Sequence, residues 1–295
     1  MTPCRFQHFA AIDWSGAAGE RQAGIALALC EAGGGAPRLL RPGHRWSRAE
    51  VLGWLLDEMP DDTLVGLDLG ASLPFVDRGG FFPGWARSPP DARALWTLVE
   101  AICVGDPHLA ATSLVDHPEL SAFFRRHGGR EGAHFGVGGR RGGQGRFRVT
   151  EAAQAAMGCR PTSNFNLVGA AQVGKSSLTG MRVLHRLAGR LAVWPFDRLP
   201  DHGSVVVEIY TSLAALAAGR RASRSKMRDP DDLDAALTAL GSPPARLPPP
   251  VSDHAADALL TAAWLRTAAD DPDLWRPQAM TPEIARTEGW TFGAR

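Results

Sequence analysis

Acidic side chains lie where the expected strands and helices begin or end, at positions where a negative charge needs a partner. Asp13 ends an apolar run, Asp68 ends a later one, and Glu208 interrupts "VVVEIY". Asp253 and Asp257 lie four residues apart at the start of the clearest predicted helix, where like charges repel by about 0.2–0.5 kcal/mol. Turns explain Asp13 and Asp68 equally well, a sheet edge can explain Glu208, and helix capping can explain Asp253. A bound cation would turn the repulsion at Asp257 into attraction.

Strand topology predicts that these acids meet. If a meander of three antiparallel strands is followed by a right-handed crossover, the fourth strand returns parallel to the first, and their carboxyl ends are adjacent. Asp13 and Asp68 would then lie side by side, Glu208 would approach from the next parallel strand, and the last helix would lay Asp257 over them. Clustered carboxylates without local Lys or Arg favour Mg²⁺ or Mn²⁺, so the expected chemistry is two-metal phosphodiester hydrolysis.

The elements that must position the acids can be followed along the chain. Strands are expected at 7–12 and 21–30, a weaker one after the Gly/Pro-rich turn that follows, a helix at 47–59 and a buried strand within 61–72. After a looser stretch, the segment 203–216 predicts a strand followed by a helix, and a helix is expected from Ser252 onward. The sequence therefore predicts one α/β domain over residues 1–295, with an insertion at roughly 75–165 and a mobile Arg/Gly-rich loop at 125–148.

Composition narrows the class of protein. The chain has 295 residues and a formal net charge of +1, so nucleic-acid contact would have to be local. The sequence contains neither an 18-residue apolar run nor an N-terminal secretory pattern, and its four cysteines form no C-x-x-C pair. A cytoplasmic protein without a membrane partner is expected.

Four segments in this order resemble a known family: "AIDWSG", "GLDLGASLPF", "VVVEIYTSLA" and "SDHAADALLTA". They are similar to a bacterial domain family of unknown function described as predicted RNase H-like nucleases, within the ribonuclease H-like superfamily. The resemblance implies a mixed five-stranded sheet of order 3-2-1-4-5 and a metal-dependent nuclease acting on nucleic acid. It implies as catalytic metal ligands Asp13, Asp68, Glu208 and Asp257, with Asp253 or His254 as an auxiliary ligand. His254 stands where the family pattern suggests a second acid.

A second motif favours a different activity. Gly169, Gly174, Lys175 and Ser176 have the G-x-x-x-x-G-K-S spacing of a nucleotide-binding P-loop. A P-loop also needs an Asp at the end of a later strand, where this chain has Glu208, and Gly180 would weaken the helix that follows. The "DLG" at Asp68 also resembles the phosphate loops of actin-like ATPases. A P-loop or actin-like NTPase and a noncatalytic nucleic-acid-binding scaffold therefore remain as alternatives.

Basic residues near the expected site are candidates for phosphate contacts. Of the 32 basic side chains only two are lysines, Lys175 and Lys226, so each lysine invites a specific explanation. Together with Arg228, Arg140 and Arg141 they are expected to hold the phosphates of a substrate, although solvated basic loops would look the same.

Overall fold

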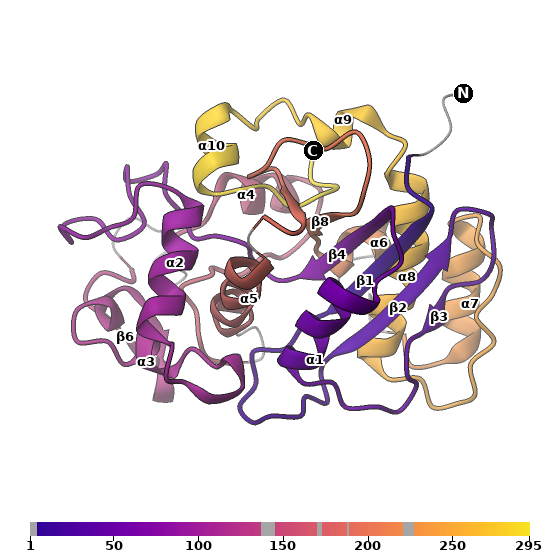
Figure 1. Cartoon of the computed structure of the whole chain (residues 1–295), viewed down its shortest axis with the longest axis horizontal. Helices are drawn as coiled ribbons and strands as arrows, with labels where there is room; N and C mark the ends of the chain where they lie inside the picture. Colours follow the sequence, from indigo (N-terminus) through magenta and orange to yellow (C-terminus); the bar gives the residue numbers. More distant parts are fainter. Residues whose placement is uncertain (1–4, 137–144, 170–172, 188, 221–226) are drawn as a thin grey trace.

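The computed structural model describes residues 5–136, 145–169, 173–187, 189–220 and 227–295. Its centre is a mixed six-stranded sheet with the strand order β3-β2-β1-β4-β8-β7. Strands β1, β2 and β3 form the expected antiparallel meander, and β4, β8 and β7 continue from β1 in parallel (Figure 1). The strand bounds are β1 His8–Asp13, β2 Ala26–Glu31, β3 Arg38–Leu39, β4 Thr63–Asp68, β7 Ala192–Trp194 and β8 Val205–Glu208.

Both faces of the sheet are buried, and alternate residues of each strand enter different cores. In β1, Ala10 and Ile12 belong to one apolar cluster, whereas Phe9 and Ala11 belong to the other. This division follows from the two-residue period of a strand. It also fixes the side on which the next residue, Asp13, must lie: the side of Phe9 and Ala11.

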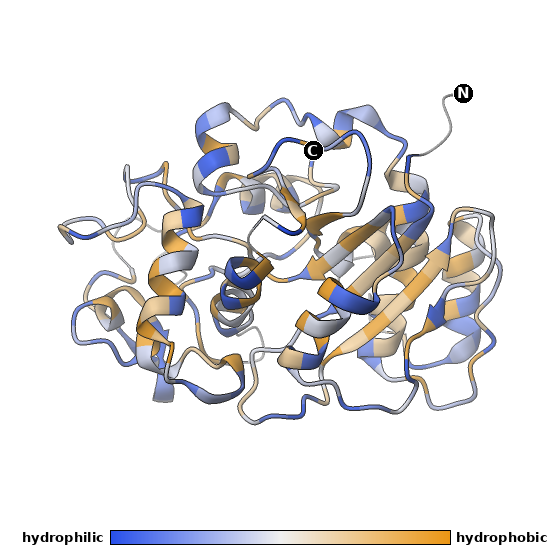
Figure 2. Cartoon of the chain, viewed as in Figure 1, coloured by the Kyte–Doolittle hydropathy of each residue, from blue (hydrophilic) through white to orange (hydrophobic). Residues whose placement is uncertain are grey.

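Helices cover each face (Figure 1). Helix α1 (Arg48–Gly53), extended by a π-helical turn over Trp54–Glu58, crosses in front of the strands, and the packed pair α2 (Ala92–Ile102) and α5 (Val173–Leu187) lies beside it. Behind the sheet lie α6 (Thr211–Ala217), α7 (Pro230–Ala239) and α8 (Asp253–Ala268), with α8 packed directly against β1 and β2. Figure 2 shows the central strands as largely apolar, whereas the helices alternate between apolar and polar residues.

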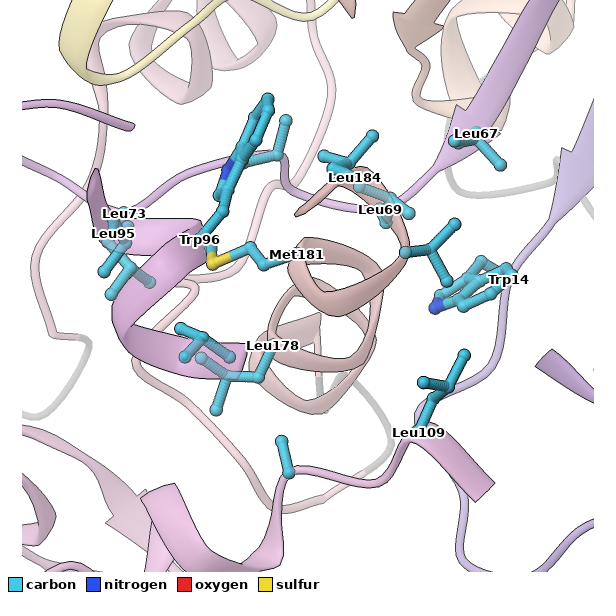
Figure 3. Packing of buried hydrophobic residues seen from close by; sticks show 14 of the residues in the cluster. Trp14, Leu67, Leu69, Leu73, Leu95, Trp96, Leu109, Leu178, Met181 and Leu184 are labelled. Atoms are coloured by element: carbon cyan, nitrogen blue, oxygen red, sulfur yellow. The ribbon is translucent and has the colours of Figure 1, made fainter. Parts of the chain in front are cut away.

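Helix α5 begins within the P-loop-like motif and continues without interruption past Gly180. Glycine at this position allows close packing, because a Cβ atom at Gly180 would come within 2.4 Å of a methyl carbon of Leu69. Figure 3 shows Met181 and Leu184 of this helix between two other apolar side chains: Leu69, which follows β4, and Trp96, which lies in α2.

The segment between β4 and β8 differs from the prediction in two respects. The sheet has six strands and not the five expected from the sequence, because β7 adds an edge strand beside β8. The segment 125–148 was expected to be a mobile loop, but its described residues include a short hairpin of β5 (Arg125–Arg126) and β6 (Arg130–Glu131) and the buried side chains of Arg146 and Arg148.

Short helices complete the chain. They are α3 (Thr112–Val115), α4 (Val149–Ala156), α9 (Pro272–Trp275) and α10 (Pro282–Thr287). The segment after α10 returns to the sheet, where the Phe292 amide donates to the carbonyl of Glu208. Within the described ranges, no helix combines the length and apolar character needed to cross a membrane.

Candidate functional site

Asp13 and Asp68 are the last residues of neighbouring parallel strands and are paired in register. Their side chains lie on the same side of the sheet, because each continues the alternation that places Phe9 and Ala11 of β1 and Leu64 of β4 against helix α8. The two carboxylates are therefore neighbours, as the strand topology predicted. Asp13 is almost fully buried, whereas Asp68 is partly exposed and lines a pocket at this end of the sheet.

Helix α8 brings His254 to the same place. Ser252 caps the helix by accepting a hydrogen bond from the amide of Ala255, which fixes the first turn. The His254 Nδ1 atom then lies 2.6 Å from Oδ2 of Asp13. This hydrogen bond is the largest of the effects that raise the pKa of His254. His254 is thus a partner of the predicted ligand Asp13, and its Nδ1 is engaged.

The charges around Asp68 are unfavourable for a carboxylate. Burial raises the pKa of Asp68 well above its usual value, and the charges of Asp13, Asp257 and Glu208 raise it further. A hydrogen bond with Thr211 opposes the shift only in part. Burial also raises the pKa of Asp13, against the lowering effect of His254. Asp257 is thus near enough to act on the pKa of Asp68, and its role as a metal ligand stays a prediction.

Glu208 is held by other partners. In β8 it pairs in register with Leu67, not with Asp68, so its side chain starts from the opposite side of the sheet. Both of its oxygens accept from Arg148, at 2.6 and 2.8 Å, and the Ala71 amide donates at 2.7 Å. The Thr291 hydroxyl donates to the same carboxylate. The charge of Glu208 still acts on Asp68, but its oxygens are satisfied within the protein.

Arg148 joins several buried groups into one network, which was not predicted from the sequence. Its guanidinium also donates to Glu151 at 2.7 and 2.8 Å and to the carbonyl of Glu288 at 3.0 Å. Burial opposes the charge on Arg148, but Glu151 and Glu208 outweigh it, so the pKa of Arg148 is raised. The spacing of Arg148 and Glu151 in "RVTE" was the available signal, because residues three apart meet on one helical face.

The remaining predicted residues do not converge on the site in the same way. Asp253 is paired with Arg228 through two hydrogen bonds of 2.9 and 3.0 Å, so a proposed ligand and a proposed phosphate contact neutralise each other. Three further candidate phosphate contacts, Lys226, Arg140 and Arg141, lie outside the described residues.

Lys175 lies in the first turn of α5 and is partly buried. The helix start packs against the loop after β1 so closely that a Cβ atom at Gly16 would lie 2.4 Å from the Ser176 amide nitrogen. Val173 and Ser176 line the pocket, whereas Lys175 is not among the described residues that do so. The described residues immediately before α5, 160–169, contain no strand, although a P-loop requires a strand, a loop and a helix in succession. This arrangement gives the nucleotide-hydrolysing alternative little support.

The pocket over Asp68 has a volume of about 520 Å³. It is walled by the loop after β1, the first turn of α5, the chain around 160–164 and the residues that follow β8. Two of its polar lining residues, Arg160 and Tyr210, were not identified from the sequence. A pocket of this size with a few convergent polar groups is typical of a small-molecule or nucleotide site.

The donor set suits a hard cation held jointly with a substrate. Among the residues that the structure describes, no three His, Cys, Asp or Glu side chains are grouped closely enough to hold a metal ion alone. Mg²⁺, however, is usually bound through one or two carboxylates together with water and substrate phosphates. Asp13 and Asp68 fit that requirement, because both are oxygen ligands and Asp68 faces the pocket among like charges.

Comparisons of the chain with protein-family models, with curated proteins and with solved structures find no match.

Proposed function

We propose that this protein is a divalent-metal-dependent phosphodiesterase that acts on nucleic acid, a nuclease built on a ribonuclease H-like core. The carrying observation is the pairing of Asp13 with Asp68 at the carboxyl ends of β1 and β4, within a group of carboxylates that repel one another. The sheet order supports the proposal, because β3-β2-β1-β4-β8 corresponds to the order 3-2-1-4-5 once the edge strand β7 is set aside.

In this proposal Asp13 and Asp68 hold Mg²⁺ or Mn²⁺, and Asp257 adds its charge from α8. The ion would activate water and stabilise the leaving oxygen of the phosphodiester. His254 orients the Asp13 carboxylate through Nδ1. Glu208 stays paired with Arg148 and fixes the end of β8. We therefore do not propose Glu208 as a ligand of a second metal ion.

The test combines cleavage with stability. Purified protein is incubated with single-stranded, duplex, hybrid and branched oligonucleotides in Mg²⁺ or Mn²⁺, and Asp68→Asn is compared with the exposed Asp270→Asn. We expect Asp68→Asn to lower the cleavage rate by about a hundredfold or more, a typical cost of losing electrostatic stabilisation at a reacting centre. The same change should raise thermal stability, because it removes a carboxyl group whose ionised form is opposed by neighbouring like charges.

Metal-dependent cleavage that survives Asp68→Asn would contradict the proposed site. Binding without cleavage under every metal condition would favour the noncatalytic scaffold. The Asp270→Asn control should match the wild-type protein in both measurements.

A further inference from the structure

Arg160 is a cation at the pocket that no acidic side chain of the described residues neutralises. The other cationic side chains lining the described pocket have carboxylate partners, Arg148 with Glu208 and Glu151, and His254 with Asp13. Arg160 is exposed and has no ion-pair partner within the described ranges. A guanidinium of this kind is suited to bidentate binding of a phosphate.

Tyr210 lines the same pocket as Arg160 and Asp68. It is partly exposed in the same pocket, and its hydroxyl makes a long hydrogen bond of 3.5 Å to the backbone carbonyl of Arg160. The next residue, Thr211, is the hydrogen-bond partner of Asp68. Burial raises the pKa of Tyr210, and the Asp68 charge is near enough to add to that effect. The aromatic ring, the guanidinium and the acidic pair are therefore parts of one site.

We propose that Arg160 and Tyr210 form a subsite for one unpaired nucleotide of a nucleic-acid strand, with the phosphate on Arg160 and the base against the Tyr210 ring. The assignment to nucleic acid rests on the proposed function. It goes further in naming the form of the substrate, a single strand or a frayed end.

The shape of the site favours a single strand over a duplex. The carboxylate of Asp68 lies at the end of the sheet, in a partly open pocket of about 520 Å³ lined by several segments of the chain. A base inside a duplex is stacked on both faces and cannot reach an aromatic side chain without leaving the stack. An unpaired base has free faces, and stacking on an aromatic ring tolerates any base.

The experiment measures binding separately from cleavage. Fluorescence anisotropy with a labelled oligothymidylate, an oligouridylate and a duplex of the same length is recorded in EDTA, so that no strand is cut. Arg160→Gln and Tyr210→Leu are compared with wild type, with Tyr210→Phe and with Arg198→Gln. Arg198 is exposed and does not line this pocket.

We expect the single strands to bind more tightly than the duplex. Arg160→Gln should weaken single-strand binding about tenfold and reduce the slope of log K against log salt by about 0.7, the loss of one phosphate contact. Tyr210→Leu should weaken binding about tenfold without changing the slope, because stacking releases no counterion. Tyr210→Phe keeps the ring and should bind as the wild type, as should Arg198→Gln.

Equal binding by Arg160→Gln, Tyr210→Leu and wild type would overturn the subsite, and so would failure of wild type to bind any single strand or tighter binding of the duplex. These outcomes differ from a failure of the proposed function. If the variants weaken binding as expected but the protein never cleaves a strand with metal, the subsite stands and the nuclease activity is refuted. If the protein cleaves but the variants bind as tightly as the wild type, the nuclease activity stands and the subsite is refuted.

Discussion

Replacement of Arg148 by alanine tests how the end of β8 is stabilised. Only 1% of the Arg148 side chain is exposed, and its partners Glu151 and Glu208 are 5% and 4% exposed. The guanidinium makes five hydrogen bonds, two to each carboxylate and one to the Glu288 carbonyl. In Arg148→Ala both glutamates would remain buried without a compensating charge.

The magnitude follows from that burial. Removing one partner of a buried ion pair costs about 3–5 kcal/mol, because the remaining charge stays desolvated. At about 2 °C per kcal/mol for a chain of this size, the melting temperature should fall by about 6–10 °C. Urea unfolding and thermal unfolding at pH 7.5 measure the loss. The control Arg286→Ala removes a guanidinium that is 56% exposed and should cost less than about 1 kcal/mol.

The loss of stability in Arg148→Ala should also increase with pH. Burial already raises the pKa of Glu151, and loss of the opposing charge of Arg148 would raise this folded-state pKa further above the unfolded value. A raised folded pKa gives stability at low pH that is lost as pH rises, so Arg148→Ala should be less deficient at pH 5 than at pH 8. The variant that combines Arg148→Met, Glu151→Gln and Glu208→Gln should recover much of the stability. A loss no greater than that of Arg286→Ala, or one independent of pH, would refute the reasoning.

Two further predictions concern the packing of α5 and the buried thiols. Gly180→Ala should destabilise the protein by about 1–3 kcal/mol in urea unfolding, although alanine is the better helix former, because its Cβ would overlap Leu69; a gain in stability would show that Leu69 moves aside. Burial raises the pKa of Cys30 to about 11 and that of Cys103 to about 12. Both thiols should therefore resist a thiol-reactive disulfide at pH 8 until the protein unfolds, and rapid labelling of either thiol in the native protein would contradict this. The stability that comes from the two neutral thiols should be lost as the pH rises above 9, because the thiols of the unfolded chain ionise first.

The adjacency of Asp13 and Asp68 could be predicted because it depends on strand order alone. Each residue ends a buried run, and the right-handed crossover rule leaves one place for the fourth strand. The position of Glu208 could not be predicted in the same way, because a shift of one residue in register moves a side chain to the other side of a sheet. The pairing of Glu208 with Leu67 is such a shift.

Contacts between residues far apart in the sequence also could not be predicted. Arg148 lies in a segment rich in Arg and Gly that was interpreted as mobile, and local composition could not show that Glu208, 60 residues away, would bury it. The hydroxyl of Thr291 reaches the same carboxylate from the last segment of the chain. Arg160 and Tyr210 were missed for the same reason, since they approach each other across 50 residues.

The charges at the two ends of the pocket differ in whether they are held by partners within the protein. Toward β8 and α4 the buried carboxylates of Glu151 and Glu208 are both held by Arg148, and a ligand could gain nothing there without breaking that network. Around Asp68 the charges of Asp13, Asp257 and Glu208 all oppose ionisation of its carboxyl group, while Arg160 has no carboxylate partner among the described residues. A metal ion would offset the repulsion at Asp68, and a phosphate would pair with Arg160. Mg²⁺ should therefore strengthen the binding of a nucleic-acid strand beyond the affinity measured in EDTA, and the strand should strengthen the binding of Mg²⁺ to the same extent.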